Sequence, residues 1–340
     1  MSPGRPEVNI EHPDSLIAYL RETGRVGESE PVEIRVLNGG VSNRTVYVAR
    51  SNGQQWVLKQ ALPKLRVEVE WLSPPERIER EALGMRWLAT LLPEGSVPAL
   101  VFEDRPRHLL AMTAVPEPHR NWKSMLLAGA LDLEHVRQFA EMLLAIHRGS
   151  SARREEAASA FGDTSFFESL RLEPYYEYTA AKVPSAARFL RDVIEENRRT
   201  KVCIVHGDYS PKNILVHRDR LVLLDHEVIH FGDPAFDIGF AMTHLLSKAH
   251  HIAARRAGFA EAAQVFWRVY SADASWADSV EQRAVRNTLA CLLARIDGRS
   301  PLEYLTEEER ARQRRAVLDL MTDPPAAISV LIGEFVRRLD

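Results

Sequence analysis

The chain is poor in cysteine and contains no long apolar run. Its 340 residues include two cysteines, Cys203 and Cys291, and each lies within an apolar stretch. We therefore expect both to pack as small core side chains rather than form a disulfide, which favours a reducing compartment. No apolar run approaches the roughly 20 residues that a membrane span needs, and residues 1–7 lack the apolar stretch of a signal peptide. The sequence predicts a cytoplasmic protein with no membrane as partner.

An excess of charge of one sign is also lacking. The 44 basic and 47 acidic side chains are mixed along the sequence, and the formal net charge is -3. We therefore expect no nucleic acid as partner. With 45% hydrophobic residues, the chain can bury a large core, and its length suits two domains or one two-lobed enzyme. The oligomeric state stays open.

The first third of the chain has the pattern of a small antiparallel sheet with one embedded helix. A short helix is expected at 14–24, because apolar residues recur there at helical spacing before Gly24. A second helical period runs from 74 to 92. Alternating apolar and polar residues predict strands, at 32–36, 45–48, 56–59, 101–102 and 109–112.

The rest of the chain is mostly helical in pattern. Residues 151–180 are the least regular part and carry a cluster of aromatic side chains. The other expected elements are helices at 132–147 and 184–197, short strands at 203–205 and 221–224, and further helices from about residue 238.

This change of pattern predicts an α+β fold with two lobes, in the arrangement of a protein-kinase-like enzyme. A small antiparallel β-sheet lobe with one helix precedes a larger, mainly α-helical lobe. We divide the chain into an N-terminal helical extension at 1–30, a nucleotide-binding lobe at 31–115, and a catalytic and substrate-binding lobe at 116–340.

The strongest chemical signal is the stretch from His206 to Asn213, with Asp225 after the next strand. Asp208 and Asn213 are five residues apart on one loop, and Asp225 follows 17 residues after Asp208. A hairpin would bring these three oxygen-bearing side chains to one edge. Phosphoryl transfer needs a carboxylate to position the attacking hydroxyl and oxygen ligands to hold Mg²⁺. The set has the hard oxygen donors of a magnesium site, not the His and Cys ligands of a zinc site.

Each of these residues alone has a simpler interpretation. Asp208 and Asn213 are residue types that commonly stabilise turns, and Asp225 could merely end a strand. The joint pattern favours the catalytic interpretation. His206 follows an apolar strand, and we expect it to brace the loop rather than transfer protons.

The pattern His-Gly-Asp-x-x-x-x-Asn followed by Asp-x-Glu resembles the aminoglycoside phosphotransferase and choline kinase superfamily, which phosphorylates small molecules. The resemblance covers nearly the whole chain. It implies ATP and Mg²⁺ as cofactors, and a hydroxyl of a sugar, an aminoglycoside-like compound or an amino alcohol as acceptor. It also implies Asp208 as the catalytic base, Asn213 and Asp225 as magnesium ligands, Glu227 as a further candidate ligand, and Asp237 as a structural residue beneath the loop.

The N-terminal lobe has residues that suit a nucleotide. Lys59 ends a strand at a distance from the Gly39-Gly40 turn that suits contact with the α- and β-phosphates. The N–H groups of this turn, with Ser42 and Asn43, would cover those phosphates. A lone Gly-Gly turn usually just reverses the chain, and a lone strand lysine is usually a solvated charge. The order of turn, strand, lysine, helix and glutamate favours the nucleotide site.

Two further parts of that site are a glutamate and a hinge. The lysine needs a glutamate on the following helix to orient it, and the family pattern favours Glu81, with Glu79 in reserve. The stretch 112–115 matches the connection between lobes. We expect the backbone near Ala114 and Val115 to bond the adenine edge.

Part of the chain is similar to the methylthioribose kinases. The similarity covers the residues after Lys59 and the stretch 236–239. The two sequences differ at Asn213, where those enzymes carry serine, and at the Asp-His-Glu metal motif, where they carry Asp-Pro-Glu. The acceptor therefore stays open.

The candidates for substrate contact lie in the aromatic segment and in a later helix. They are Tyr175, Tyr176, Arg295 and Arg299. Aromatic rings could stack on a ring or enclose a cation, but they could equally pack this segment onto the lobe. The C-terminal half is nearly balanced in charge, which counts against a polycationic aminoglycoside.

Three other functions agree less well with the sequence. A protein kinase needs a long activation segment, whereas 12 positions separate Asp225 from Asp237. A non-catalytic nucleotide-binding module would typically lack a metal or base residue. Transfer of AMP would release pyrophosphate instead of ADP.

The adjacent His250 and His251 could suggest a metal site. Adjacent residues on a helix point apart, however, so we expect both histidines at the surface.

Overall fold

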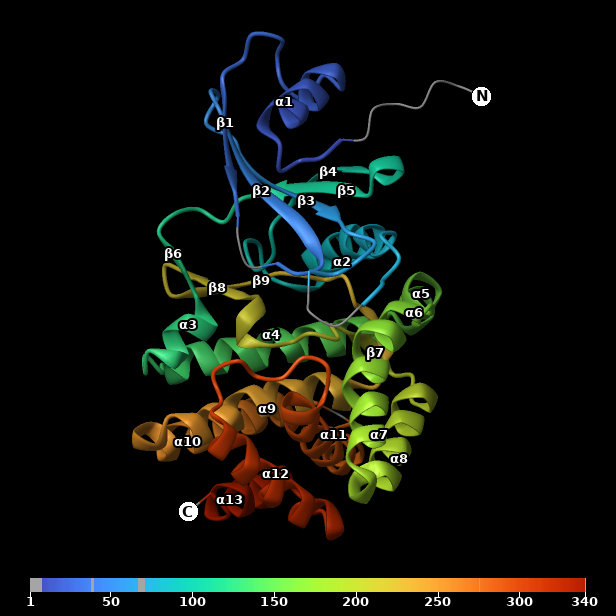
Figure 1. The fold of residues 1–340 in the computed structure, drawn as a ribbon, viewed down its shortest axis with the longest axis vertical. Helices are drawn as coiled ribbons and strands as arrows, with labels where there is room; N and C mark the ends of the chain where they lie inside the picture. The colour runs from blue at the N-terminus through green and yellow to red at the C-terminus, as the bar shows by residue number, and fades with distance from the viewer. Residues whose placement is uncertain (1–7, 38–39, 67–70, 275, 340) are drawn as a thin grey trace.

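The computed structural model places a small sheet-containing part above a larger helical part (Figure 1). It describes residues 8–37, 40–66, 71–274 and 276–339. The chain from Val8 onward packs against the sheet, and the last helices lie at the far end of the helical part (Figure 1). Among the described residues, no helix combines the length and the apolar character needed to cross a bilayer.

The N-terminal part is built on a five-stranded antiparallel sheet with the order β1-β2-β3-β5-β4. Side chains alternate between the faces of a strand, so Trp56 and Leu58 are buried on one face while Val57 and Lys59 point to the other. The strands are β1 Val32–Val36, β2 Asn43–Arg50, β3 Gln55–Ala61, β4 Leu100–Asp104 and β5 Leu109–Thr113.

One helix covers each face of this sheet. Helix α1 (Pro13–Glu22) buries Leu16 and Leu20 in the same apolar cluster as Trp56 and Leu58. The predicted N-terminal extension is thus packed on the sheet from residue 8 onward. Helix α2 (Arg77–Leu91) lies against the other face, the one to which Lys59 points.

The larger part joins many helices to two small sheets. One has the strand order β6-β8-β9 and the other pairs β7 with β10. The strands are β6 His119–Asn121, β7 Cys203–Val205, β8 Ile214–His217, β9 Arg220–Leu223 and β10 His230–Gly232. The α-helices are α3 Trp122–Leu127, α4 Leu133–Ala152, α5 Arg154–Phe161, α6 Ser165–Phe167, α7 Tyr178–Lys182, α8 Ala187–Arg199, α9 Pro234–His251, α10 Arg256–Ala272, α11 Ala277–Asp297, α12 Glu307–Thr322 and α13 Ile328–Arg337.

Helix α9 is the centre of the helical part and is buried on nearly all sides. The prediction of two surface histidines is wrong for His250, which is 2% exposed and lies beside the Gln313 side chain at 3.3 Å. Most of α9 is enclosed by other helices and has no solvent side, so pointing away from His251 does not expose His250. The prediction for the cysteines is confirmed, because both are free and buried.

The segment expected to be least regular is in fact helical. Its central part is a π-helix, η2 (Glu168–Glu177), with Pro174 inside it. Proline removes one backbone donor and disturbs an ordinary α-helix, and π-helical turns occur frequently at functional sites. The irregular composition therefore reflects an unusual helix rather than a loop.

Candidate active site

The loop after β7 is held from beneath by a buried carboxylate. Asp237, at the start of α9, accepts hydrogen bonds from the backbone N–H groups of His206 at 2.6 Å and Gly207 at 2.9 Å. Gly207 has a φ of 77°, and a Cβ there would lie 2.9 Å from the Val228 carbonyl oxygen. Only glycine suits that position. The structural role expected for Asp237 is confirmed.

His206 braces the same loop, as expected. Its Nδ1 atom lies 3.2 Å from the backbone nitrogen of Asp208, and its Nε2 atom lies 3.1 Å from Nδ1 of His226. Burial lowers the pKa of His206, so the neutral ring is favoured. A neutral imidazole can accept the Asp208 N–H and hold the loop without adding charge.

Asp208 is paired with an arginine that the sequence did not reveal. Arg171, in the π-helix, lies 2.9 Å from the Asp208 carboxylate through Nη2 and donates from Nε to the Gly207 carbonyl at 2.7 Å. Both residues are almost fully buried. Arg171 thus fixes the carboxylate and the loop together. No local pattern signals this pair, because 37 positions separate the two residues.

Asn213 and Asp225 lie on two loops that are bonded to one another. The Asn213 side-chain amide donates to the Asp208 backbone carbonyl at 3.0 Å, and the Asn213 backbone carbonyl accepts from the Leu224 N–H at 2.9 Å. Asp225 has a φ of 67°, a left-handed conformation that aspartate tolerates better than most residues. These contacts bring the three predicted oxygen donors together around one cavity.

Lys59 joins the sheet, helix α2 and the Asp225 loop. Its Nζ atom donates to Glu81 Oε1 at 2.6 Å and to Asp225 Oδ1 at 2.9 Å. Burial alone would lower the pKa of Lys59, but the two carboxylates outweigh it and raise that pKa. Burial also acts to raise the pKa of Asp225, yet Lys59 and Lys212 lower it below its usual range. The lysine is therefore charged and Asp225 ionised.

The structure decides between the two candidate glutamates. Glu81 is 1% exposed and bonded to Lys59, whereas Glu79 lies 3.6 Å from Arg105 on the surface side. Ile78 and Met85 share the buried face of α2 with Glu81, because residues three and four apart lie on one side of a helix. That spacing could have identified Glu81 from the sequence.

Glu227 is held by a second buried ion pair. Its Oε2 atom lies 3.1 Å from Arg77 Nε and accepts a hydrogen bond from Asn43 Nδ2 at 3.2 Å. The rest of the Arg77 guanidinium donates to four backbone carbonyls, including that of Ser42. Glu227 therefore links the turn before β2 to the metal motif, and its Oε1 atom stays a candidate ligand.

The predicted phosphate-covering turn and hinge both reach the cavity. Gly40, Ser42 and Asn43 line it, and so do the two predicted hinge residues; Gly39 lies outside the described residues. The Ala114 N–H donates to the Gln55 carbonyl at 2.9 Å. Within the described residues the Val115 N–H has no hydrogen-bond acceptor, so Val115 offers the donor for an adenine edge.

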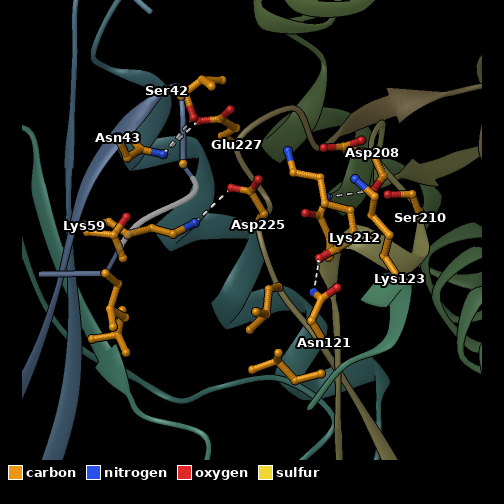
Figure 2. Close-up of a pocket in the computed structure, with 18 of the residues that line it drawn as sticks. Ser42, Asn43, Lys59, Asn121, Lys123, Asp208, Ser210, Lys212, Asp225 and Glu227 are labelled. Carbon is orange, nitrogen blue, oxygen red and sulfur yellow. Dashed lines mark hydrogen bonds and ion pairs between the residues drawn. The ribbon is translucent and has the colours of Figure 1, made fainter. Parts of the chain in front are cut away.

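These side chains surround one cavity of about 1000 Å³. Figure 2 shows Lys59 and Asp225 meeting on one side of it, with Asp208, Ser210 and Lys123 on the other. The volume lies at the upper end of the usual range for ligand pockets. Two substrates could therefore bind side by side.

The oxygen donors suit Mg²⁺. Asp225 and Asn213 both line the cavity, and in the described parts of the chain no group of three or more His, Cys, Asp or Glu side chains is arranged to hold a metal alone. Mg²⁺ typically takes one or two protein carboxylates and completes its shell with phosphate oxygens and water. Asn213 and Asp225, with Glu227 as a further candidate, are therefore compatible with a Mg·nucleotide complex.

The candidate substrate residues divide into two groups. Tyr175, Arg295 and Arg299 line the cavity. Tyr176 does not: it is 1% exposed, and its hydroxyl donates to the Asn287 carbonyl at 3.4 Å. A contact of Tyr176 with substrate is therefore not supported, because its ring packs in the core of the helical part.

Comparison with protein families gives a match over residues 33–277, to the family described as the phosphotransferase enzyme family. Methylthioribose kinase 2 of Oryza sativa subsp. japonica is 25% identical over 264 residues, which cover 68% of this chain and 61% of the rice enzyme. The match thus spans less than two thirds of that relative's length.

Solved structures show a shared fold. An amicoumacin kinase in complex with AMP-PNP, Ca²⁺ and amicoumacin has a TM-score of 0.58 and 14% identity, covering 86% of this chain and 89% of that one. An ADP-bound aminoglycoside phosphotransferase has a TM-score of 0.51 and 16% identity, covering 93% and 99%. The protein-kinase-like fold predicted from the sequence is confirmed.

Proposed function

Because the chain belongs to the phosphotransferase enzyme family, we propose that it transfers the γ-phosphate of ATP, with Mg²⁺, to a hydroxyl of a small molecule. The observation that carries this proposal is the bridge that Lys59 makes to Glu81 and Asp225 in the cavity that Asp208 lines. That arrangement supplies a cation for phosphates, a metal ligand and a carboxylate for a hydroxyl. Relatives that are named kinases of small molecules support it.

Each residue has a role that follows from its position. The Lys59 ammonium would bind the α- and β-phosphates, and Val115 would donate its N–H to adenine. Asn213 and Asp225 would hold Mg²⁺, which supplies neutralising charge at the β- and γ-phosphates. Asp208 would accept the hydroxyl proton as the hydroxyl oxygen attacks phosphorus. Arg171 holds the Asp208 carboxylate in position.

The test is the replacement Asp208→Asn, which keeps the shape of the side chain but removes its charge and its basicity. We expect the rate of acceptor-dependent ADP release to fall about 10³-fold, with the affinity for Mg·ATP unchanged by calorimetry. Asp163→Asn is the control, because Asp163 is an exposed carboxylate that pairs with Arg80 and does not line the cavity. Wild-type turnover by D208N would contradict the assignment.

The acceptor screen also separates the alternatives. Sugars, amino alcohols, aminoglycosides and hydroxy acids are incubated with Mg·ATP, and ADP, pyrophosphate and labelled protein are measured. Release of ADP with a phosphorylated small molecule supports the proposal. Pyrophosphate would indicate AMP transfer, label in protein would indicate a protein kinase, and tight binding without turnover would indicate a non-catalytic module.

A further inference from the structure

Arg295, on α11, presents a positive charge to the cavity, and no carboxylate of the described residues forms an ion pair with it. The residue is 8% exposed and lines the cavity. Its Nη1 atom donates to the Tyr175 hydroxyl at 3.1 Å, to the Ser300 hydroxyl at 2.9 Å and to the Ser300 carbonyl. All of these acceptors are uncharged. Its buried Nε atom has no hydrogen-bond partner among the described residues.

A second buried cation lies behind the same wall. Lys248, on α9, is fully buried and donates to the His244 carbonyl at 3.1 Å, and His244 lines the cavity. Lys248 and Lys123 approach the Tyr304 ring, with their Nζ atoms 5.6 and 6.0 Å from its centroid. Burial and the positive charges of Lys123 and Arg295 lower the pKa of Lys248 to about 7, while the negative charge of Glu303 acts to raise it. Positive charge therefore dominates this wall, although Glu303 also lines the cavity.

The carboxylates near this wall are already engaged. Glu303 is bound by Lys123, Glu173 lies 3.6 Å from Arg299, and Asp208 is paired with Arg171. Within the part of the chain that the structure describes, neither Arg295 nor Lys248 has a carboxylate partner. An unpaired buried charge is costly, so a ligand that brings a negative charge would be bound favourably there.

We propose that the phosphate acceptor carries an acidic group, a carboxylate or a phosphate, which binds the Arg295 guanidinium while its hydroxyl lies at Asp208. This inference rests on the proposed function. A guanidinium binds either acid through two parallel hydrogen bonds. Amino sugars and amino alcohols would place a cation against this wall, and the proposal disfavours them.

The distance between the two groups suits a small molecule. The Tyr175 ring is close to both arginines, with the Arg171 guanidinium carbon 5.6 Å and that of Arg295 5.5 Å from its centroid. Arg171 in turn holds Asp208 at 2.9 Å. One hydroxy acid or sugar phosphate can therefore extend from Asp208 past Tyr175 to Arg295.

The proposed phosphate transfer needs only ATP, the acceptor hydroxyl and Asp208. The acceptor oxygen forms a bond to the γ-phosphorus, and the bond from that phosphorus to the β–γ bridging oxygen breaks. The hydroxyl proton passes to Asp208, and ADP leaves with the electron pair of the broken bond. The acidic group of the acceptor takes no part in the chemistry and serves only to hold the molecule at Arg295.

The experiment compares matched probes that differ in one group. Glycerol, D-glycerate, glycerol 3-phosphate and 3-amino-1,2-propanediol form one series, and D-ribose, D-ribonate and D-ribose 5-phosphate form another. Binding is measured by ligand-observed NMR with saturating Mg·AMP-PNP, and turnover by ADP release with Mg·ATP. We expect one acid class, carboxylate or phosphate, to bind at least about tenfold more tightly than the neutral and cationic members.

Variants connect that preference to Arg295. Arg295→Met should weaken binding of the preferred acid about 10- to 100-fold, with Mg·AMP-PNP affinity unchanged. Arg295→Lys keeps the positive charge and should weaken acid binding less than R295M does. This partial retention would show that the loss in R295M does not come from a folding defect. The control is Arg283→Met on the same helix, because Arg283 bonds Asp233 and does not line the cavity.

The outcomes separate the two proposals. Equal binding of neutral and acidic probes, no binding by any acid of either series, or acid binding unaffected by R295M would each overturn the acidic-acceptor proposal. Failure of the protein to bind Mg·AMP-PNP would instead contradict the kinase function. Acid binding is then measured without nucleotide, where the same dependence on Arg295 is still expected.

Discussion

The two ends of the cavity handle charge in opposite ways. At the nucleotide end, Lys59 has two carboxylate partners and Arg77 has Glu227. At the acceptor end, Arg295 and Lys248 donate to uncharged oxygens. Both ends are largely buried, so the contrast does not come from solvent exposure.

Under the proposed function, this difference matches what each ligand would bring. ATP would arrive with Mg²⁺, which offsets much of its negative charge, and the protein keeps its own charges paired before such a complex binds. The acceptor arrives without a metal. A cation left unpaired at that end favours a ligand that carries its own negative charge.

The largest effect is expected from breaking a compensated pair. Arg77→Met leaves Glu227 buried without its cation and leaves four backbone carbonyls without their donor. We expect a loss of about 3–5 kcal/mol in the free energy of unfolding, measured by urea denaturation.

The matched control for this variant lies on the same helix. Arg86 is about half exposed and pairs with Glu103 at 3.2 Å. Arg86→Met should cost about 0–1 kcal/mol, because exposed ion pairs contribute little. Equal losses for R77M and R86M would mean that the nucleotide end is not stabilised by its buried pairing.

A smaller effect is expected when only the orientation of Lys59 is disturbed. Glu81→Gln removes one of its two carboxylate partners while keeping the shape of the side chain. We expect the KM for Mg·ATP to rise about tenfold, because the ammonium then moves toward Asp225. Glu79→Gln is the matched control, since Glu79 faces Arg105. A larger effect for E79Q than for E81Q would reverse the assignment of the pair.

Residues that are close in the sequence could be predicted well. A short hairpin joins the loop that carries Asp208 and Asn213 to the loop that carries Asp225. The short spacing in the sequence therefore places the three side chains close together. The alternation along β3 likewise fixes the face to which Lys59 points. Local periodicity and strand pairing were sufficient for this part of the site.

Side chains that meet across the fold could not be predicted. Arg171 reaches Asp208 from a π-helix whose composition looked irregular, and Arg77 reaches Glu227 across 150 positions. The sequence around Lys248 carries no sign that this lysine is buried, but α9 is enclosed by other helices. Whether a charge is paired depends on packing between distant segments, which hydrophobic periodicity does not record.

The smallest effect is expected from removing Lys248, a buried cation without a carboxylate partner at the acceptor end. The pKa of Lys248 is lowered to about 7, whereas a lysine in the unfolded chain titrates near pH ~10.4. Between these values the unfolded state binds more protons, so the wild type gains stability as the pH rises above 7. Below pH 7 the ammonium is charged in both states, and the cost of burying it is complete.

Lys248→Met should therefore be more stable than the wild type at pH ~6, by about 1 kcal/mol, and the difference should narrow as the pH approaches ~9. Urea denaturation at several pH values measures both changes. Lys182→Met is the control, because Lys182 is half exposed and lies 3.6 Å from Asp297; its effect should not reproduce this pH trend. If K248M is less stable than the wild type at pH ~6, the buried Lys248 ammonium must have a stabilising partner. The proposed contrast, in which cations at the acceptor end lack ion-pair partners, would then be wrong.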